Sequence, residues 1–244
     1  MTGMVLGSAA SAAAQVLAAK LSGTAPSTSA THEAGQENVA APDPFINRVS
    51  SQSQQVALTF DDGPTPGVTE LILDELKRRD VLATFFMIGE RVAAHPDLAR
   101  RVAAEGHEIG NHTYTHPKLN TLPDQQVALE IQQTQDIILK VTQQTPVSFR
   151  PPYLAFRKNQ APLAQAKGLN IICGDVDSRD WSEPGEEKIL ELIFAKTSSG
   201  SIIICHDRHQ QTANCIGSIL DGLIQRGFKI GTISSLLIST QTLN

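Results

Sequence analysis

Two adjacent carboxylates, Asp61 and Asp62, end an apolar run in the segment "ALTFDDGPTPG". Gly63 and Pro64 follow at once and stop the run. Neighbouring ionised Asp side chains repel each other, so a dianion is stable only where a cation or water screens it. Capping of the next helix would account for one of the two carboxylates but needs no second. The pair therefore predicts a cation nearby.

Two imidazoles with four-residue spacing, His112 and His116 in "NHTYTHP", form the second reactive group. A helical turn or a wide loop would bring both rings to one side. An isolated HxxxH pair is more often two surface histidines than a metal site. Two neutral imidazoles with one carboxylate, however, leave a position open on Zn²⁺, which is the pattern of a catalytic zinc site. Joined to Asp61 and Asp62, the pair predicts that one Asp binds a divalent metal ion while the other stays free.

Three more polar groups follow later apolar runs: residues 150–153 in "FRPPYLAF", residues 175–181 in "DVDSRDW", and His206 with Asp207 in "IIICHD". Each has an ordinary structural explanation. Arg150 could be a surface residue of a Pro-Pro turn, Trp181 a packing residue of an acidic loop, and His206 a hydrogen-bonded structural histidine. These explanations suffice one by one, but they do not say why every group follows an apolar run.

Short apolar runs alternate with amphipathic stretches from residue 55 onward. We predict strands in "QVALTF", "ATFFMIG", "HEIGNH", "VSFR", "NIICGDV", "SIIICH" and "FKIGTI". Between these runs, apolar residues return near the helical period, as at Val127, Ile131 and Ile138. Four glycines stand where such helices would end: Gly106, Gly168, Gly200 and Gly227.

This order of elements predicts an α/β fold with about seven parallel strands. No GxGxxG follows the first strand, so a dinucleotide-binding sheet is not favoured, and we expect a distorted (β/α) barrel. The loops after the carboxyl ends of parallel strands converge on one rim. Because all the polar groups follow predicted strands, the sequence places them together on that catalytic rim.

The composition is that of an ordinary soluble globular protein of 244 residues, with 41% apolar and 18% charged residues. A formal charge of -5 gives no electrostatic reason to expect a nucleic-acid partner. Cys173, Cys205 and Cys215 lack CxxC spacing, and we expect them to be buried as small apolar side chains. An exposed thiol at Cys205 could instead bind a metal or oxidise.

The N-terminal part of the chain differs in composition from the rest. Residues 1–30 are rich in Ala and Ser and too weakly apolar for a membrane-spanning helix. We interpret them as a signal, export or anchoring segment, although the first basic residue is Lys20, and expect no transmembrane helix in the mature protein. Residues 31–53 have few large apolar side chains and are predicted to be a disordered linker, followed by a catalytic domain over residues 54–244.

In order and spacing, "TFDDGP", "HTYTH", "RPPY", "DSRDW" and "IIICHD" resemble the motifs of the polysaccharide deacetylases of carbohydrate esterase family 4. The resemblance extends from Val56 to the C-terminus. It implies a distorted barrel and one divalent metal ion, which we expect to be Zn²⁺, with Co²⁺ or Ni²⁺ as alternatives.

The resemblance also implies roles for the residues at these motif positions. Asp62, His112 and His116 are expected to bind the metal. Asp61 is expected to act as the general base that takes a proton from the attacking water. Arg150 would hold Asp61 in place through a charge-assisted hydrogen bond.

The later motifs complete the expected catalytic set. The backbone N–H of Tyr153 would stabilise the developing oxyanion. His206 would protonate the leaving nitrogen as general acid, with Asp180 favouring its charged form. Trp181 and Ile204 would be apolar walls that accept the acetyl methyl group, although the family often has Leu at the position of Ile204.

The resemblance implies a polysaccharide N-deacetylase, a hydrolase that removes N-acetyl groups from N-acetylglucosamine residues of peptidoglycan, chitin or chitooligosaccharide. Two alternatives stay open: a metal-dependent hydrolase of a small non-peptide amide, and a non-catalytic glycan-binding protein with the same fold. An enzyme directed at the cell wall would lie outside the cytoplasm, as a secreted, periplasmic or wall-associated protein. The sequence carries no signal for oligomeric state.

Overall fold

The computed structural model describes residues 43–51 and 53–241. They form a 9-stranded sheet in which all pairings between the strands are parallel. The strands are β1 (Phe45–Ile46), β2 (Gln55–Asp61), β3 (Thr84–Met87), β4 (Glu108–Asn111), β5 (Ser148–Phe149), β6 (Asn170–Ile172), β7 (Val176–Asp177), β8 (Ile202–His206) and β9 (Lys229–Gly231). Their spatial order is β1-β6-β5-β4-β3-β2-β8-β7, with β9 beside β2.

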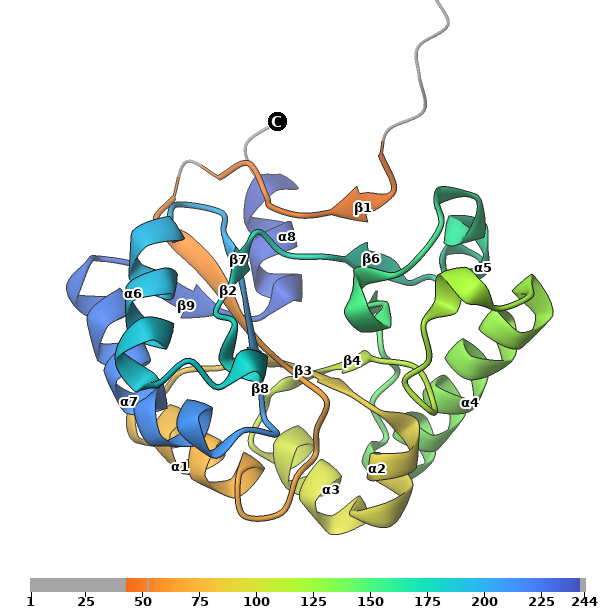
Figure 1. Ribbon diagram of the computed structural model, residues 1–244, viewed down its shortest axis with the longest axis horizontal. Helices are drawn as coiled ribbons and strands as arrows, with labels where there is room; N and C mark the ends of the chain where they lie inside the picture. Colours follow the sequence, from red (N-terminus) through yellow and green to blue (C-terminus); the bar gives the residue numbers. More distant parts are fainter. Residues whose placement is uncertain (1–42, 52, 242–244) are drawn as a thin grey trace, which may run out of the picture. The chain divides into compact units, whose positions relative to one another are not determined.

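Helices connect these strands and lie around the outside of the curled sheet (Figure 1). The α-helices of the described residues are α1 (Thr69–Arg78), α2 (Gly89–Ala94), α3 (Pro96–Ala104), α4 (Asp124–Thr142), α5 (Ala161–Gln165), α6 (Glu186–Lys196), α7 (Gln210–Gln225) and α8 (Ile233–Gln241). Short 3₁₀ turns are η1 (Leu119–Thr121), η2 (Pro152–Leu154), η3 (Lys158–Gln160) and η4 (Asp180–Ser182). The predicted α/β class and distorted barrel are confirmed.

Each of the seven predicted strand segments contains a strand, but the sheet has more strands than predicted. One reason is that "NIICGDV" forms two strands, β6 and β7, separated at Gly174. Gly174 has a φ of +90°, and a Cβ there would meet Ile204 Cγ1 at 2.8 Å, so the chain turns where no other residue fits. The other reason is β1, whose two apolar residues are too few to give a periodic signal.

The segment around β1 lies in the range predicted to be a linker. Ile46 O accepts a hydrogen bond from Cys173 N at 2.8 Å, and Val49 N donates to Gly200 O at 3.0 Å. The segment therefore bridges the gap between β6 and the start of β8, and the ordered fold begins before residue 54. The predicted leader, and the linker up to residue 42, lie outside the described residues.

Alternation along β2 decides which side chains reach the site. Leu58 and Phe60 pack in the main hydrophobic core with side chains of α1 and α7. Ala57 packs on the other face of the sheet, in the cluster that contains Ile202. Because successive side chains of a strand point to opposite faces, Asp61 lies on the same face as Ala57, away from α1 and α7.

Helix α8 closes one end of the barrel. Ile233 and Leu236 are fully buried, and they pack in the same inner cluster as Ala57. Gln55, the first residue of β2, donates its side-chain N–H to Ser235 Oγ at 3.2 Å, so α8 lies at the amino ends of the strands. The opposite end, where the strands have their carboxyl ends, is the end open to a substrate.

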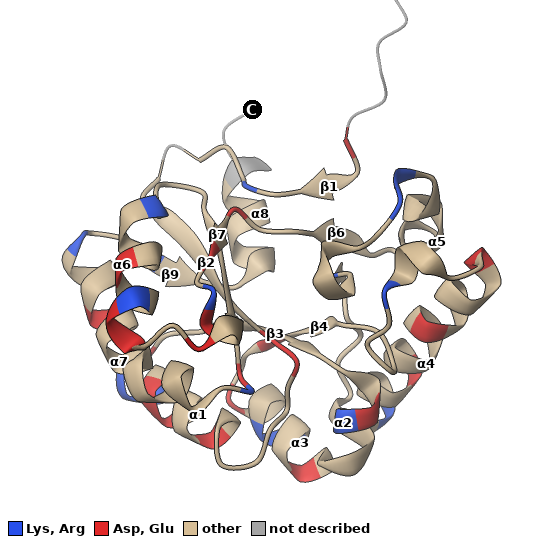
Figure 2. Cartoon of the chain, viewed as in Figure 1, with Lys and Arg blue, Asp and Glu red and all other residues tan. Residues whose placement is uncertain are grey.

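The outer helices carry charged residues of both signs. In Figure 2 acidic and basic residues are interspersed over these helices. Within residues 43–51 and 53–241, no helix is both long and apolar enough to cross a lipid bilayer.

Candidate active site

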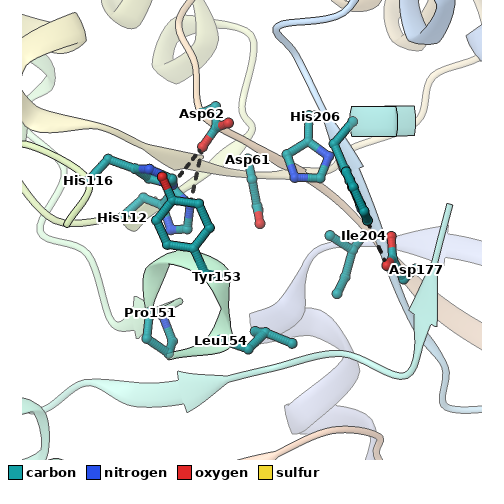
Figure 3. Close-up of a pocket in the computed structure, with 11 residues that line it drawn as sticks. Asp61, Asp62, His112, His116, Pro151, Tyr153, Leu154, Asp177, Ile204 and His206 are labelled. Atoms are coloured by element: carbon teal, nitrogen blue, oxygen red, sulfur yellow. Dashed lines mark hydrogen bonds and ion pairs between the residues drawn. The ribbon is translucent and has the colours of Figure 1, made fainter. Parts of the chain in front are cut away.

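The end of β2 presents the two carboxylates in different directions. Asp61 is the last residue of the strand and points into the barrel mouth, where Arg150 Nη1 lies 2.6 Å from its Oδ1. Asp62 has a positive φ of 75°, which turns the chain out of the strand before Gly63. Figure 3 shows Asp62 turned toward the two histidines and Asp61 between this group and His206. The turn thus separates two neighbouring carboxylates that would otherwise repel each other.

The loop after β4 brings His112 and His116 to Asp62. Their Nε2 atoms lie 3.4 Å and 3.0 Å from Asp62 Oδ1. The four-residue spacing is accommodated by a wide loop and not by a helical turn, since Thr113 and His116 have positive φ values of 65° and 60°. The predicted grouping of one carboxylate with two imidazoles is present in the structure.

The donor atoms of this group fit a divalent metal ion. They all lie within 4.8 Å of one another. Asp62 Oδ1 is buried and has no well-directed hydrogen bond, although both imidazole nitrogens are close. One carboxylate oxygen and two imidazole nitrogens that converge in this way match the protein ligands of a catalytic zinc site. The other histidines and acidic residues of the described chain form no comparable group of three.

The residues around His112 and Asp62 favour the forms of these side chains that bind a cation. His112 Nδ1 lies 2.7 Å from Arg150 O, so this nitrogen donates its proton to the carbonyl and leaves the lone pair on Nε2. Burial by itself would raise the pKa of Asp62, but the two nearby imidazoles of His112 and His116 outweigh it and hold the pKa below its ordinary range. Asp62 is therefore ionised throughout the neutral pH range.

Arg150 is buried, with 1% of its surface exposed, so the interpretation as a surface residue of a Pro-Pro turn is wrong. Its Nη1 donates to Asp61 Oδ1 and, at 2.7 Å, to Thr59 Oγ1. Its guanidinium carbon lies 4.2 Å from the centre of the Phe86 ring. A cation fixed on three sides holds Asp61 in one orientation, as predicted from the motif.

The opposite wall of the site carries His206, at the end of β8. Its Nδ1 lies 2.6 Å from Asp180 Oδ1, and its backbone N donates to Asp180 Oδ2 at 2.7 Å. Thr212 Oγ1 donates to the same oxygen of Asp180, which has no exposed surface. His206 is therefore a hydrogen-bonded histidine, as the structural explanation expects. Its partner, however, is a buried carboxylate directly behind the cavity.

The pairing with Asp180 changes the protonation of His206. Burial would lower the pKa of His206, but the hydrogen bond and charge of Asp180, with smaller contributions from Asp61 and Asp62, raise it to about 9. His206 is therefore protonated at neutral pH. Because folding raises this pKa, the pair adds stability below pH 6.5, and that contribution is lost as the pH rises through about 9.

Replacement of Asp180 should move the alkaline limit of turnover. In Asp180→Asn only burial and the more distant carboxylates act on His206, so its pKa should fall from about 9 toward or below 6.5. We expect kcat at pH 8 to fall by at least about 10-fold and to recover in part at lower pH, since the acid form returns there. A pH profile of kcat from pH 5 to pH 10 measures the shift.

The matched control is Asp177→Asn, which removes a carboxylate from the same wall. Asp177 accepts hydrogen bonds from Arg179 N and Trp181 Nε1 and has none to His206. The alkaline limit of kcat in Asp177→Asn should be the same as in the wild type. An unchanged limit in Asp180→Asn would contradict the assignment of His206 as the group that titrates.

A cavity of about 380 Å³ joins the two walls. It is lined by eleven residues, ten of them labelled in Figure 3: Asp61, Asp62, His112, His116, Pro151, Tyr153, Leu154, Asp177, Trp181, Ile204 and His206. Most of the residues predicted to lie on one rim are therefore together, with Arg150 and Asp180 buried directly behind Asp61 and His206. The prediction is wrong for two residues. Asp175 accepts hydrogen bonds from Ser201 Oγ and Ile202 N at the start of β8, and Asp207 is buried against Thr69 Oγ1.

Two aromatic side chains flank the mouth of this cavity. Tyr153 is 63% exposed and Trp181 is 54% exposed, so both offer an aromatic face to a ligand. Ile204 lies deeper, with 7% of its surface exposed. Tyr153 has a left-handed backbone, with φ of 57° and ψ of 13°, directly after the two prolines. Exposed aromatic faces above the buried side chain of Ile204 suit a ligand with flat apolar faces.

Four residues at the site were given no individual role by the sequence. Pro151, Leu154 and Asp177 line the cavity, and Thr59 bonds to Arg150 behind it. Pro151 and Asp177 lie within the motifs "RPPY" and "DVDSRDW". Their position beside predicted site residues could have indicated that they line the cavity. Leu154 and Thr59 gave no such signal, because apolar and β-branched residues are expected anywhere in a barrel.

The three cysteines are unpaired and buried, as predicted. Cys205 has no exposed surface and packs in the main core with Cys215. Burial raises the pKa of the Cys205 thiol well above its ordinary value. Since neighbouring residues of β8 point to opposite faces, Cys205 points toward the helices while His206 points into the site. The alternative of an exposed, metal-binding or oxidisable thiol at Cys205 is therefore wrong.

Comparison with known proteins agrees with this geometry. A family model described as polysaccharide deacetylase matches residues 48–172, a range that includes both carboxylates, both metal-facing histidines and Arg150. The chain belongs to the polysaccharide deacetylase family. Enzymes of this family are metal-dependent, and the described residues include a cluster that could bind a metal.

Two curated relatives of this chain are named for different glycans. It is 38% identical over 184 residues to the peptidoglycan-N-acetylglucosamine deacetylase of Listeria monocytogenes, and the alignment covers 75% of this chain and 39% of the relative. It is 35% identical over 204 residues to the chitooligosaccharide deacetylase of Rhizobium leguminosarum bv. trifolii, with 78% and 94% covered. The chain thus spans well under half of the first relative and nearly all of the second.

A solved structure in the same family shows that this fold does not guarantee activity. A CE4 family pseudoenzyme from Bacillus anthracis superposes with a TM-score of 0.78 at 29% identity, covering 82% of this chain and 70% of the other chain. A mutant of that pseudoenzyme has restored enzymatic activity. Whether the present chain turns over a substrate must therefore be argued from its own side chains.

Proposed function

We propose that this protein is a metal-dependent hydrolase that removes N-acetyl groups from N-acetylglucosamine residues of a polysaccharide. One observation carries the proposal. A free carboxylate, Asp61, is held by a buried arginine between a metal-binding group on one side and a protonated histidine on the other. Amide hydrolysis needs these parts: a base for the water, an acid for the leaving amine, and a cation.

The proposed steps follow from the positions of the side chains. Asp62, His112 and His116 would hold the metal ion, which, when bound, acidifies water at neutral pH. Asp61 takes the proton of the attacking water, because its carboxylate faces the cavity and Arg150 fixes its orientation. The base is therefore ready before the substrate binds.

The leaving amine is the difficult part of amide hydrolysis. His206 faces the cavity from the wall opposite the metal-binding group and is protonated at neutral pH, so it donates a proton to the departing nitrogen. Asp180 holds the ring in place and stabilises its charge. The backbone N–H of Tyr153 is proposed to donate to the oxyanion, a role that rests on its position in "RPPY".

The walls of the cavity support an acetyl group as the acyl part. We propose that Ile204 and Trp181 contact the methyl group, since Ile204 forms part of the floor and Trp181 lies at the mouth. Each extra methylene of a bulkier acyl group changes binding by only about 1–3 kcal/mol, so selection for acetyl depends on the limited space of the cavity.

The substrate is proposed to be peptidoglycan or a chitin-type oligosaccharide of N-acetylglucosamine. The relative that this chain covers almost completely acts on chitooligosaccharide, and the Listeria relative acts on the N-acetylglucosamine of peptidoglycan. Exposed Tyr153 and Trp181 on two sides of the cavity leave room for a chain to continue in both directions. A polymer, and not a small amide, is favoured by this open mouth.

The metal ion is proposed to be Zn²⁺, because two imidazoles and one carboxylate are ligands typical of catalytic zinc. Co²⁺ and Ni²⁺ also accept imidazole nitrogen and could replace it. Metal analysis of protein purified without added metal identifies the ion.

We further propose that the protein works outside the cytoplasm, where a cell-wall substrate lies. Residues 1–30 are rich in Ala and Ser, which suits an export or anchoring segment, and residues 31–42 join this segment to the catalytic domain. Cell fractionation followed by intact-mass measurement tests the location and shows whether the N-terminus is removed.

Incubation with a panel of acetylated glycans tests the function. The panel contains N-acetylchitooligosaccharides, N-acetylated peptidoglycan fragments and a small cyclic amide. Mass spectrometry detects a loss of about 42 mass units for each acetyl group removed from a glycan. We expect loss of acetyl from a glycan, abolished by a chelator and restored by Zn²⁺ or Co²⁺. Turnover of the small amide alone would favour the amide hydrolase. Glycan binding without acetate release under any metal would favour the non-catalytic protein.

A further inference from the structure

The loop that carries His116 has an unusual backbone. It leaves β4 at Asn111 and returns toward η1 without forming a helix. Thr113 and His116 both have positive φ values, a conformation that L-residues adopt only where their surroundings hold them. Some part of the protein outside the loop must therefore fix the position of this proposed metal ligand.

The carbonyl side of the loop is held by helix α2. Gly89 N donates to Thr113 O at 2.9 Å, and Glu90 N donates to Tyr114 O at 3.0 Å. These bonds fix the loop from one side and satisfy two of its acceptors. They leave its amide groups to find partners elsewhere.

Thr113 N donates to Asn111 Oδ1 at 3.0 Å, and the next two amides of the loop are held by one carboxylate, that of Glu130 on α4. Glu130 Oε2 accepts hydrogen bonds from Tyr114 N and Thr115 N, both at 2.8 Å. Glu130 Oε1 accepts a third from Thr115 Oγ1 at 2.7 Å. Two consecutive amides and a hydroxyl thus converge on one side chain, immediately before His116.

We infer that Glu130 is a positioning residue for His116, and that it sets the affinity and geometry of the metal site without touching the metal or the substrate. Glu130 does not line the catalytic cavity. Hydrogen bonds to an ionised acceptor are stronger than those to a neutral one, so a single carboxylate can fix the two peptide units that precede the ligand. The inference rests on the proposed metal site, but it concerns metal binding and not turnover.

The test compares Glu130→Ala with Asp136→Ala, which removes a carboxylate from the exposed face of the same helix. Asp136 accepts a hydrogen bond from Gln132 and makes none to the loop. Zn²⁺ affinity is measured by competition with a chromophoric chelator, and the visible spectrum of the Co²⁺ form reports the ligand geometry. Loss of an outer-sphere partner of a metal ligand typically weakens binding by about 10–100-fold, and we expect this loss in Glu130→Ala with an altered Co²⁺ spectrum. Asp136→Ala should match the wild type in both measurements.

Glu130→Gln separates positioning from a general effect on folding. Its amide oxygen can still accept from Tyr114 N and Thr115 N, so we expect metal affinity between the wild type and Glu130→Ala. Circular dichroism and a melting curve of each metal-free variant show whether it is folded. If Glu130→Ala does not fold, Glu130→Gln decides alone.

Wild-type Zn²⁺ affinity and an unchanged Co²⁺ spectrum in a folded Glu130→Ala would overturn the inference, as would wild-type affinity in Glu130→Gln if that variant alone folds. A wild type that binds Zn²⁺ but releases no acetate would refute the proposed function. The inference on Glu130 would then still be decided by the Zn²⁺ affinity and Co²⁺ spectrum of its variants. A wild type that binds no Zn²⁺ or Co²⁺ would overturn both.

Discussion

Asp61→Asn should lower kcat by about 10²–10⁴-fold while the protein keeps its metal ion, since this is the range that a general base contributes. Asn has nearly the shape of Asp and keeps an oxygen that can accept from Arg150, but it cannot take a proton from water. The metal-facing atoms belong to Asp62, His112 and His116 and are untouched by the change. Steady-state kinetics and metal analysis of the same sample measure the two effects.

The variant also leaves the buried charge of Arg150 without its partner. Removal of one member of a buried ion pair typically costs about 3–5 kcal/mol of stability, and an isosteric Asn that still accepts a hydrogen bond should cost less. Assays below the melting temperature therefore separate lost chemistry from lost structure. Wild-type kcat in a folded, metal-loaded Asp61→Asn would show that another group takes the proton.

Asp62→Ala should lose the metal ion itself. Removal of a direct ligand must weaken binding by more than the 10–100-fold typical of outer-sphere partners, so we expect more than about 100-fold loss of Zn²⁺ affinity. Turnover should fall with it and should return only in part at high metal concentration. Competition with a chelator measures the Zn²⁺ affinity. Acetate release across a range of Zn²⁺ concentrations measures the turnover.

The control for this variant is Asp97→Ala, at the start of α3. The side chain of Asp97 is 94% exposed and pairs with Arg100 at the surface. Its removal changes the net charge by the same amount and should leave metal affinity and turnover at wild-type values. Asp62→Ala with undiminished Zn²⁺ affinity would mean that the ion binds elsewhere.

The fold was predictable because parallel strands covered on both faces are short, continuous apolar runs. Strand β2 has all seven residues buried, and it stands out in the sequence for that reason. The strand β1 was not predictable, since Phe45 and Ile46 are held by partners more than a hundred residues away, the strand β6 and, for Phe45, the ring of Phe156. The split between β6 and β7 at Gly174 depends on contacts with β8 in the same way.

The site was predictable in its members but not in its geometry. Residue types at strand ends placed Asp62, His112 and His116 on one rim, and the structure brings them together. The spacing of the two histidines left a helical turn and a loop equally open, because either brings the rings to one side. The choice is made by partners distant in sequence, among them Glu130 on α4.

The central claim is that Asp62, His112 and His116 bind one divalent ion beside a carboxylate that stays free. The most direct test is an anomalous difference map from crystals of the zinc-loaded protein, recorded at the zinc absorption edge. We predict one peak about 2.0–2.2 Å from Asp62 Oδ1 and from both Nε2 atoms, with Asp61 outside the coordination distance. A map with no peak at these three atoms, or with the zinc bound by Asp61 instead of Asp62, would contradict the account.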